Sequence, residues 1–295
     1  MTSDNTSLHV CTTPSDLSVL TDQLRADGRS IALVPTMGAL HDGHMQLVRA
    51  AKELPNATVI VSIFVNPLQF GPTEDLDSYP RTLSADLDLL AAEGVDVAFA
   101  PTANDMYPHG YRSTVNPGPL ATELEGATRP GHFAGALTVC AKLFGISRAN
   151  HAFFGEKDYQ QLVLLKQMVE DLNLPITLHP VPIRREESGL ALSSRNRYLS
   201  AEEHALAQQL SASLRAGVAA AEGGATPREV VDATRTHLAQ YPQIDVDYIE
   251  IRDAGLQPLG DYADATVAAR LLLAARVGTT RLIDNMGLML QPWDY

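Results

Sequence analysis

Apolar runs alternate with amphipathic segments through the first ~180 residues of the chain. The apolar runs predict strands at 31–34, 58–65, 95–100, 151–154 and 176–181. The segments between them carry apolar residues at helical spacing and predict helices at 14–26, 44–52, 83–93, 135–146 and 158–172. Alternation of this kind predicts an α/β fold, a parallel sheet with helices on both faces. Ligands of such sheets bind beyond the carboxyl ends of the strands.

The pattern changes near residues 182–187. After an intervening loop, two Ala-rich stretches predict helices at 201–222 and 227–240, separated by Gly223 and Gly224. Extended stretches follow at 245–252 and 268–276. We therefore expect two domains, 1–183 and a smaller α+β domain at 184–295.

Composition limits the class of protein. The chain has 295 residues, of which 45% are hydrophobic and 19% charged, and its apolar runs are too short to span a membrane. The polar N-terminus lacks the pattern of a signal peptide, and Cys11 and Cys140 lie far apart. We therefore expect a cytoplasmic protein with free thiols and no membrane partner. The net charge of -13 argues against broad nucleic-acid binding but leaves room for a small anionic ligand.

A His-x-x-His pattern follows the first predicted strand. The run from Pro35 to His44 contains a Gly turn, after which a helix is predicted to begin near His41. The strand is predicted to end at Pro35. His41 and His44 are three residues apart, at the positive end of the helix, where two imidazoles can donate hydrogen bonds to a phosphate chain. A capped surface turn is the plain alternative, and a zinc site would need further ligands.

A second polar turn follows the predicted strand at 151–154. Gly155 permits close backbone approach, Lys157 lies near a helix start where it could pair with an anion, and Gln161 offers donor and acceptor groups. The alternative is that Lys157 and Asp158 are merely solvated residues of a helix start.

Three further groups could bind anions or polar substrates. Ser193, Ser194 and Arg195 lie on the loop between the predicted domains, where a guanidinium gives a forked contact to phosphate.

Asn66 and Gln69, with Tyr79, supply neutral groups for a hydroxy acid or carboxylate. Arg129 and His132 form a turn with two possible cations, although Arg129 could equally make a surface salt bridge.

Taken together, these segments resemble the pantoate–β-alanine ligase family in order and spacing, over residues from about 10 to 285. The matching segments are 34–44, 62–70, 77–82, 129–133, 154–161 and 192–196. The resemblance implies a Rossmann-like doubly wound domain with a smaller C-terminal lid domain, usually in a homodimer. It also implies an ATP-dependent ligase acting with Mg²⁺. Pantoate would attack the α-phosphate of ATP to give pantoyl adenylate and pyrophosphate, and β-alanine would then release AMP and form pantothenate.

The resemblance also implies roles for individual residues. The catalytic residues would be His44, His41, Lys157, Ser193 and Arg195. The ATP site would comprise Met37, Gly38, His41, Gly43, His44, Gly155, Lys157, Asp158, Arg184, Leu192, Ser193, Ser194 and Arg195. Pantoate and β-alanine would contact Gln69, Gln161, Asn66, Tyr79, Arg129 and His132.

Two positions depart from the family pattern. Relatives often carry acidic residues at the positions of Ala85 and Asp86 that are proposed to contact Mg²⁺, and only Asp86 is acidic here, so no metal ligand is assigned. Arg184 stands where relatives often have a small apolar residue beside adenine. Two other functions fit some of the motifs: a nucleotidylyltransferase, which would form no amide bond, and a nucleotide-binding module without turnover.

Overall fold

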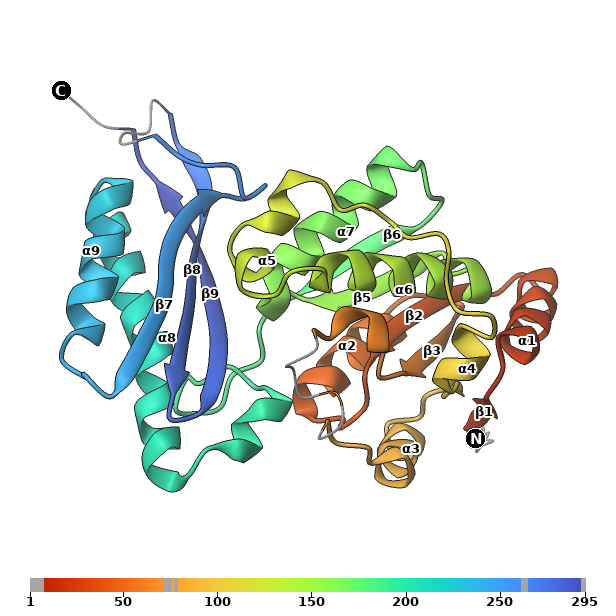
Figure 1. The fold of residues 1–295 in the computed structure, drawn as a ribbon. Helices are drawn as coiled ribbons and strands as arrows, with labels where there is room; N and C mark the ends of the chain where they lie inside the picture. Colours follow the sequence, from red (N-terminus) through yellow and green to blue (C-terminus); the bar gives the residue numbers. More distant parts are fainter. Residues whose placement is uncertain (1–7, 72–75, 77–78, 261–264, 293–295) are drawn as a thin grey trace. The chain divides into compact units, whose positions relative to one another are not determined.

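The computed structural model describes residues 8–71, 76, 79–260 and 265–292. The expectations about the N-terminal residues 1–7 and about Asp77 and Ser78 lie outside these ranges. The chain divides into two compact units (Figure 1). Unit 1 comprises Met1–Glu156 and Leu164–Pro182, and unit 2 comprises Lys157–Val163 and Ile183–Tyr295. One of the boundaries between the units falls within helix α7 (Tyr159–Asp171).

Unit 1 is built on a parallel sheet with the spatial order β1-β4-β3-β2-β5-β6. Figure 1 shows its central strands β3, β2 and β5. Its strands are β1 (His9–Cys11), β2 (Ser30–Thr36), β3 (Ala57–Ile63), β4 (Val97–Phe99), β5 (His151–Gly155) and β6 (Thr177–Val181). The strand order reverses between β2 and β5, so the carboxyl ends of these two strands flank the topological switch point where doubly wound sheets bind ligands.

Helices cover both faces of this sheet. Ala32 and Val34 of β2 belong to one core with Val48 and Leu90, whereas the alternating residue Leu33 is buried against the opposite face. Helices α1 and α6 pack together and on β2, which accounts for that second face. The helices of unit 1 are α1 (Pro14–Ala26), α2 (Asp42–Lys52), α3 (Leu83–Ala92), α4 (Ala103–Met106), α5 (Glu125–Thr128) and α6 (His132–Ser147), with 3₁₀ turns η1 (Pro67–Gln69) and η2 (Pro119–Thr122). The 3₁₀ turn η3 (Glu156–Asp158) spans the boundary between the two units. The parallel α/β fold predicted from the sequence is confirmed.

The predicted end of the first strand at Pro35 is wrong, because β2 continues to Thr36. The carbonyl of Thr36 accepts from Phe64, so Thr36 faces β3 and its neighbour Pro35 faces the β5 side. The register with β5 covers Ala32 and Leu33 and stops before Pro35. Proline has no N–H to donate, and it is tolerated there because the ladder has already ended.

Unit 2 contains an antiparallel sheet in the order β7-β8-β9, packed against two helices. Its elements are η4 (Ser194–Tyr198), α8 (Ala201–Glu222), α9 (Pro227–Leu238), β7 (Ile244–Asp253), β8 (Val267–Val277) and β9 (Thr280–Leu290). Leu210 and Leu214 of α8 share a core with Leu271 of β8. Both helices begin at capping boxes, at Ser200 and Thr226.

Strands β1 and β9 were absent from the sequence prediction. The helix expected at 227–240 ends two residues earlier, at Leu238. Both cysteines are free and buried, and burial raises the pKa of the Cys140 thiol to about 12. Within the described part of the chain, none of the helices has the length and hydropathy needed to cross a membrane.

Candidate functional site

The two histidines of the His-x-x-His pattern cap helix α2. The helix begins at Asp42, directly after His41, near which the sequence predicts its start, and two residues before the predicted range 44–52. His41 is its N-cap. Nδ1 of His41 accepts a hydrogen bond from the backbone N–H of Gly43 at 3.1 Å. Nδ1 of His44 accepts from the backbone N–H of His41 at 3.2 Å, and the ring centroids lie 4.1 Å apart. The pair therefore forms a capping box made of imidazoles.

This capping fixes the tautomer of both rings. A backbone N–H can only donate, so Nδ1 of each ring must be unprotonated. The proton of each neutral imidazole is then on Nε2, which makes Nε2 a hydrogen-bond donor on both rings. His41 and His44 thus present N–H donors at the positive end of α2, a combination suited to an anion such as phosphate.

The turn that leads into α2 has left-handed backbone conformations at two successive residues. Gly38 has φ 85° and Ala39 has φ 50°. The buried carboxylate of Asp86 on α3 accepts the N–H of Ala39 at 3.0 Å and that of Leu40 at 2.8 Å. Asp86 therefore binds the main chain immediately before His41.

A second cluster in unit 1 surrounds Gln69. The amide of Asn66 donates to Oε1 of Gln69 at 3.2 Å and to the carbonyl of Gly135 at 3.1 Å. Nε2 of Gln69 donates to the sulfur of Met37 at 3.1 Å. Because the carbonyl end of the Gln69 amide is held by Asn66, its NH₂ end is the one directed away from Asn66.

His132 holds the backbone of Gln69. Nδ1 of His132 lies 2.8 Å from the carbonyl oxygen of Gln69, which can only accept, so Nδ1 carries a proton. Nε2 of His132 lies 3.1 Å from the Arg129 guanidinium, which can only donate. His132 is therefore neutral in this arrangement, not the second cation suggested by the sequence.

Tyr107 is a member of this cluster that the sequence did not identify. Its hydroxyl donates to Oδ1 of Asn66 at 3.0 Å. Burial raises the pKa of Tyr107 to about 12, and Cys140 and Tyr111 add to the increase. Tyr107 follows a four-residue helix with no motif around it, so no sequence signal pointed to it. Tyr79, by contrast, is buried with its ring edge-on to Phe70.

In unit 2, a small cavity brings Lys157 together with Ser193. Asn196 and Asp284 also line it. Ser193 caps η4 by accepting from the N–H of Arg195 at 3.2 Å, and Lys157 is 3.8 Å from Asp158. Oδ1 of Asn196 is buried and has no hydrogen-bond partner among the described residues. The cavity is therefore lined by residues that carry a cation, a hydroxyl and an amide.

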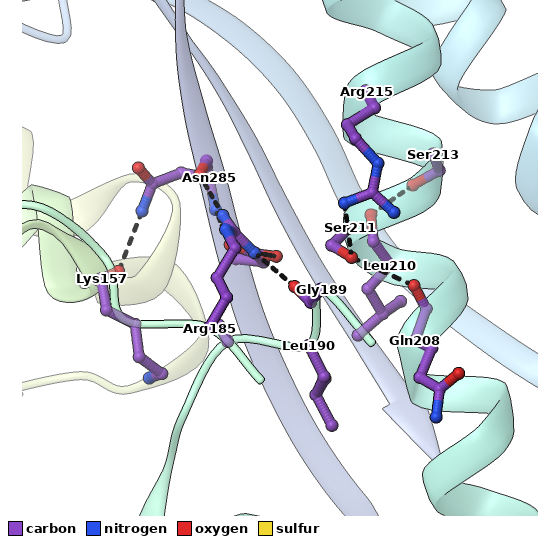
Figure 2. Close-up of polar contacts among 12 residues, drawn as sticks. Lys157, Arg185, Gly189, Leu190, Gln208, Leu210, Ser211, Ser213, Arg215 and Asn285 are labelled. Carbon is purple, nitrogen blue, oxygen red and sulfur yellow. Dashed lines mark hydrogen bonds and ion pairs between the residues drawn. The ribbon is translucent and has the colours of Figure 1, made fainter. Parts of the chain in front are cut away.

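The loop that carries Ser193 is fixed by Arg185. The guanidinium of Arg185 makes a two-point contact with the buried carboxylate of Asp284, at 2.7 and 2.8 Å. It also donates to the carbonyls of Gly189 and Asn285, as Figure 2 shows. The amide of Asn285 donates to the carbonyl of Lys157 at 3.0 Å (Figure 2). These contacts join the loop and Lys157 to strand β9.

The other predicted residues of these two segments lie close in sequence to Lys157 or to Ser193. Gly155 ends β5, and a Cβ built on it would meet no described atom within 4 Å. Gln161 lies in the first turn of α7 and Ser194 begins η4. Arg184 and Leu192 pair through a backbone hydrogen bond of 2.9 Å.

In the part of the chain that the structure describes, no protein-held metal site is found. Among the residues that the structure describes, no three His, Cys, Asp or Glu side chains are grouped to hold an ion. Both carboxylate oxygens of Asp86 accept backbone N–H groups. The position at which relatives are proposed to contact Mg²⁺ thus carries a carboxylate with both oxygens in hydrogen bonds to the main chain.

Comparisons with known proteins agree with one another. The family profile described as Pantoate-beta-alanine ligase matches residues 9–287. Pantothenate synthetase of Mycolicibacterium smegmatis is 58% identical over 281 residues, covering 95% of this chain and 88% of that protein. The Nocardia farcinica protein of the same name is 58% identical over 277 residues, covering 94% and 85%.

Solved structures show the same relationship. A pantothenate synthetase structure from Thermus thermophilus has a TM-score of 0.88 at 44% identity, covering 95% of this chain and 99% of that one. A pantoate-beta-alanine ligase from Francisella tularensis, complexed with beta-gamma ATP and beta-alanine, has a TM-score of 0.78 at 36% identity, with 95% and 97% covered.

Proposed function

Because this chain belongs to the pantoate–β-alanine ligase family, we propose that it makes pantothenate through a pantoyl-adenylate intermediate. The ligase activity and the use of ATP follow from the family; the intermediate and the residue roles are the proposal. The observation that carries it is the pair of Nε2–H donors at the start of α2, directly after the strand at the switch point.

The first step would activate the carboxylate of pantoate. A carboxylate oxygen attacks the α-phosphorus of ATP, the bond from that phosphorus to the bridging oxygen breaks, and pyrophosphate leaves with the electron pair. Negative charge grows on the departing phosphates. His41 and His44 would stabilise that charge by donating from Nε2, as donors aimed at developing charge do.

Lys157, Ser193 and Arg195 would hold the phosphates. Their chemistry suits this role, since the cavity of unit 2 contains the Lys157 ammonium and the Ser193 hydroxyl. The Arg185–Asp284 pair would keep the Ser193 loop and Lys157 in a fixed relation. Gly155, Asp158 and the loop from Arg184 to Ser194 complete the proposed nucleotide contacts.

Gln69 would bind pantoate as a hydrogen-bond donor. Asn66 holds the Oε1 end of Gln69, so the NH₂ group is the end available to a carboxylate or hydroxyl oxygen. In the described chain, that NH₂ group donates to the uncharged sulfur of Met37. Gln161 would make the second amide contact to pantoate, and Tyr79 and Arg129 would contribute to substrate binding.

The second step would form the amide. The amine of β-alanine attacks the acyl carbon of the adenylate, the carbon–oxygen bond breaks, and AMP leaves with the oxygen that came from pantoate. Adenylation is needed because oxide is a poor leaving group, and binding both partners supplies the attack geometry.

Three further assignments belong to the proposal. Mg²⁺ would arrive with ATP, held by phosphates and water as is usual for this ion. We also propose a homodimer in the cytoplasm, which light scattering and cell fractionation would test. The role of residues 184–295 as a lid is likewise proposed.

An isotope experiment tests the intermediate. With ¹⁸O in the carboxylate of pantoate, the mechanism predicts label in AMP in step with pantothenate, and pantoate-dependent exchange of pyrophosphate into ATP when β-alanine is withheld. Pantothenate formed without label in AMP would refute the adenylate. Absence of pantothenate under saturating substrates would refute the function itself.

A further inference from the structure

Asp86 has an unusual position for a charged side chain. It is 3% exposed on helix α3, yet its partners are main-chain N–H groups and a hydroxyl. Oδ1 accepts from Leu40, and Oδ2 accepts from Ala39 and from the hydroxyl of Thr82 at 3.1 Å. A buried carboxylate costs free energy unless such bonds offset its lost hydration, and these three donors supply that offset.

The segment that Asp86 binds is conformationally demanding. Ala39 has a positive φ of 50°, which costs a non-glycine residue free energy. At Gly38, with φ 85°, a Cβ would lie 3.1 Å from Oδ2 of Asp86 and 3.1 Å from Ile63. The turn therefore persists because the carboxylate holds two successive N–H groups in place.

We propose that Asp86 is a positioning residue for nucleotide binding, which acts by fixing the Gly38–Leu40 turn immediately before His41. The role in nucleotide binding rests on the proposed function, whereas the fixing of the turn by Asp86 does not depend on it. The backbone N–H of His41 is part of the imidazole capping box, so the path of the turn determines the position of both Nε2–H donors.

This role is distinct from that of a magnesium ligand. The N–H groups of Ala39 and Leu40 direct their positive ends at the two oxygens where a cation would have to bind. A divalent ion at Asp86 would have to share these two oxygens with donors that already draw on their negative charge. The geometry favours an anchor for the main chain.

The decisive comparison is Asp86→Asn against Asp88→Asn. Asp86→Asn keeps the shape of the side chain but replaces one carboxylate oxygen by an NH₂ group that faces a backbone N–H. Asp88 is an exposed residue of the same helix, so Asp88→Asn serves as the matched control. We expect Asp86→Asn to lower kcat/KM for ATP roughly tenfold or more at every Mg²⁺ concentration, with KM for β-alanine unchanged. Asp88→Asn should behave as the wild type.

A second readout needs no activity. Hydrogen exchange should show faster exchange at the amides of Ala39 and Leu40 in Asp86→Asn than in Asp88→Asn. Thr82→Val, which removes one of the three donors, should give a smaller change in the same direction and keeps the test valid if Asp86→Asn does not fold.

Two results would overturn the proposal. One is unchanged exchange at Ala39 and Leu40 in both Asp86→Asn and Thr82→Val. The other is recovery of Asp86→Asn activity by excess Mg²⁺, which would identify a metal ligand. If the wild type makes no pantothenate, the proposed function fails, whereas the exchange measurement still decides whether Asp86 anchors the turn.

Discussion

At the scale of single residues, hydrogen-bond direction assigns roles that residue type alone leaves open. The sequence placed two imidazoles at a helix start, but their usable nitrogen follows from the backbone contacts of the other nitrogen. The same reasoning makes His132 a neutral link between Arg129 and Gln69. No pattern of letters contains this information, because it depends on which groups meet in space.

Substitution of His44 separates capping from donation. Asparagine can place its Oδ1 where Nδ1 of His44 accepts from His41, but it has no group at the position of Nε2. His44→Asn should therefore fold like the wild type and yet lose roughly a hundredfold in pantoate-dependent pyrophosphate–ATP exchange. Circular dichroism and urea unfolding provide the control. An exchange rate near the wild-type value would show that the Nε2–H donor is not needed.

Gly155 gives a second prediction at this scale. A Cβ there meets no described atom within 4 Å, so the chain's own packing does not require glycine. Gly155→Ala should leave the urea midpoint unchanged but weaken ATP binding measured by calorimetry, if the backbone of Gly155 approaches the ribose. Equal affinity in both proteins would remove Gly155 from the nucleotide contacts.

At the scale of elements, helices were predicted more accurately than their surroundings. Helices α1 and α8 have the predicted ends because their caps, Thr13 and Ser200, can be read in the sequence. Strand β9 was missed because Asp284 and Asn285 interrupt its apolar pattern. Both are buried, and their partners Arg185 and Lys157 are ~100 residues or more away in the chain. Long-range pairing of this kind cannot be read locally.

Tyr107 connects the end of α4 to the Asn66–Gln69 cluster. Tyr107→Phe removes the donor to Oδ1 of Asn66, which keeps its bond from Leu68. We expect a loss of about 1 kcal/mol in the free energy of unfolding and a several-fold higher KM for pantoate, with kcat little changed. Tyr111→Phe, an exposed neighbour, is the control. A KM equal to that of the control would show that Asn66 is oriented without Tyr107.

Strands β5 and β6 carry a pair of histidines that should make the free energy of unfolding depend on pH. Nδ1 of His151 lies 3.0 Å from Nε2 of His179, and burial, with a smaller effect of His151, lowers the pKa of His179 below 6.5. The folded state thus favours neutral His179. Its contribution to stability is present above the unfolded pKa of about 6.5 and is lost as pH falls below that value.

Urea unfolding at about pH 7.5 and pH 5.5 measures this effect. The midpoint of the wild type should fall more between these two values than that of His179→Gln, while exposed His109→Gln should behave as the wild type. The same pH dependence in all three proteins would exclude the histidine pair as its source.

At the scale of the whole molecule, the chain carries a net charge of -13 and is proposed to bind an anionic nucleotide. This requires local cations and N–H donors to outweigh the overall charge, a role proposed for Lys157 and for the start of α2. The architecture followed from alternation of strands and helices. The anchoring of the site turns by Asp86 and Arg185 did not, since it depends on tertiary contacts.

Binding of the nucleotide should stabilise the folded chain. ATP at about 100 times its Kd should add about 2.7 kcal/mol to the free energy of unfolding and raise Tm by several degrees. Lys157→Ala should reduce that shift, and adenosine should produce less of it than ATP because it lacks phosphates. Equal shifts with ATP and adenosine in calorimetry would contradict phosphate recognition.

The first residues of α7 belong to unit 2 although they lie between two stretches of unit 1 in the sequence. The hydroxyl of Tyr159 donates to the carbonyl of Ala254. Cζ of the Arg270 guanidinium lies over the Tyr159 ring, 3.8 Å from the ring centroid. Truncation of the chain after Pro182 would remove both partners of Tyr159, Ala254 and Arg270, and would expose its aromatic ring to solvent. Residues 183–295 therefore cannot be removed without loss to the remainder, because a chain that ends at Pro182 keeps the first turn of α7 without the contacts that hold it.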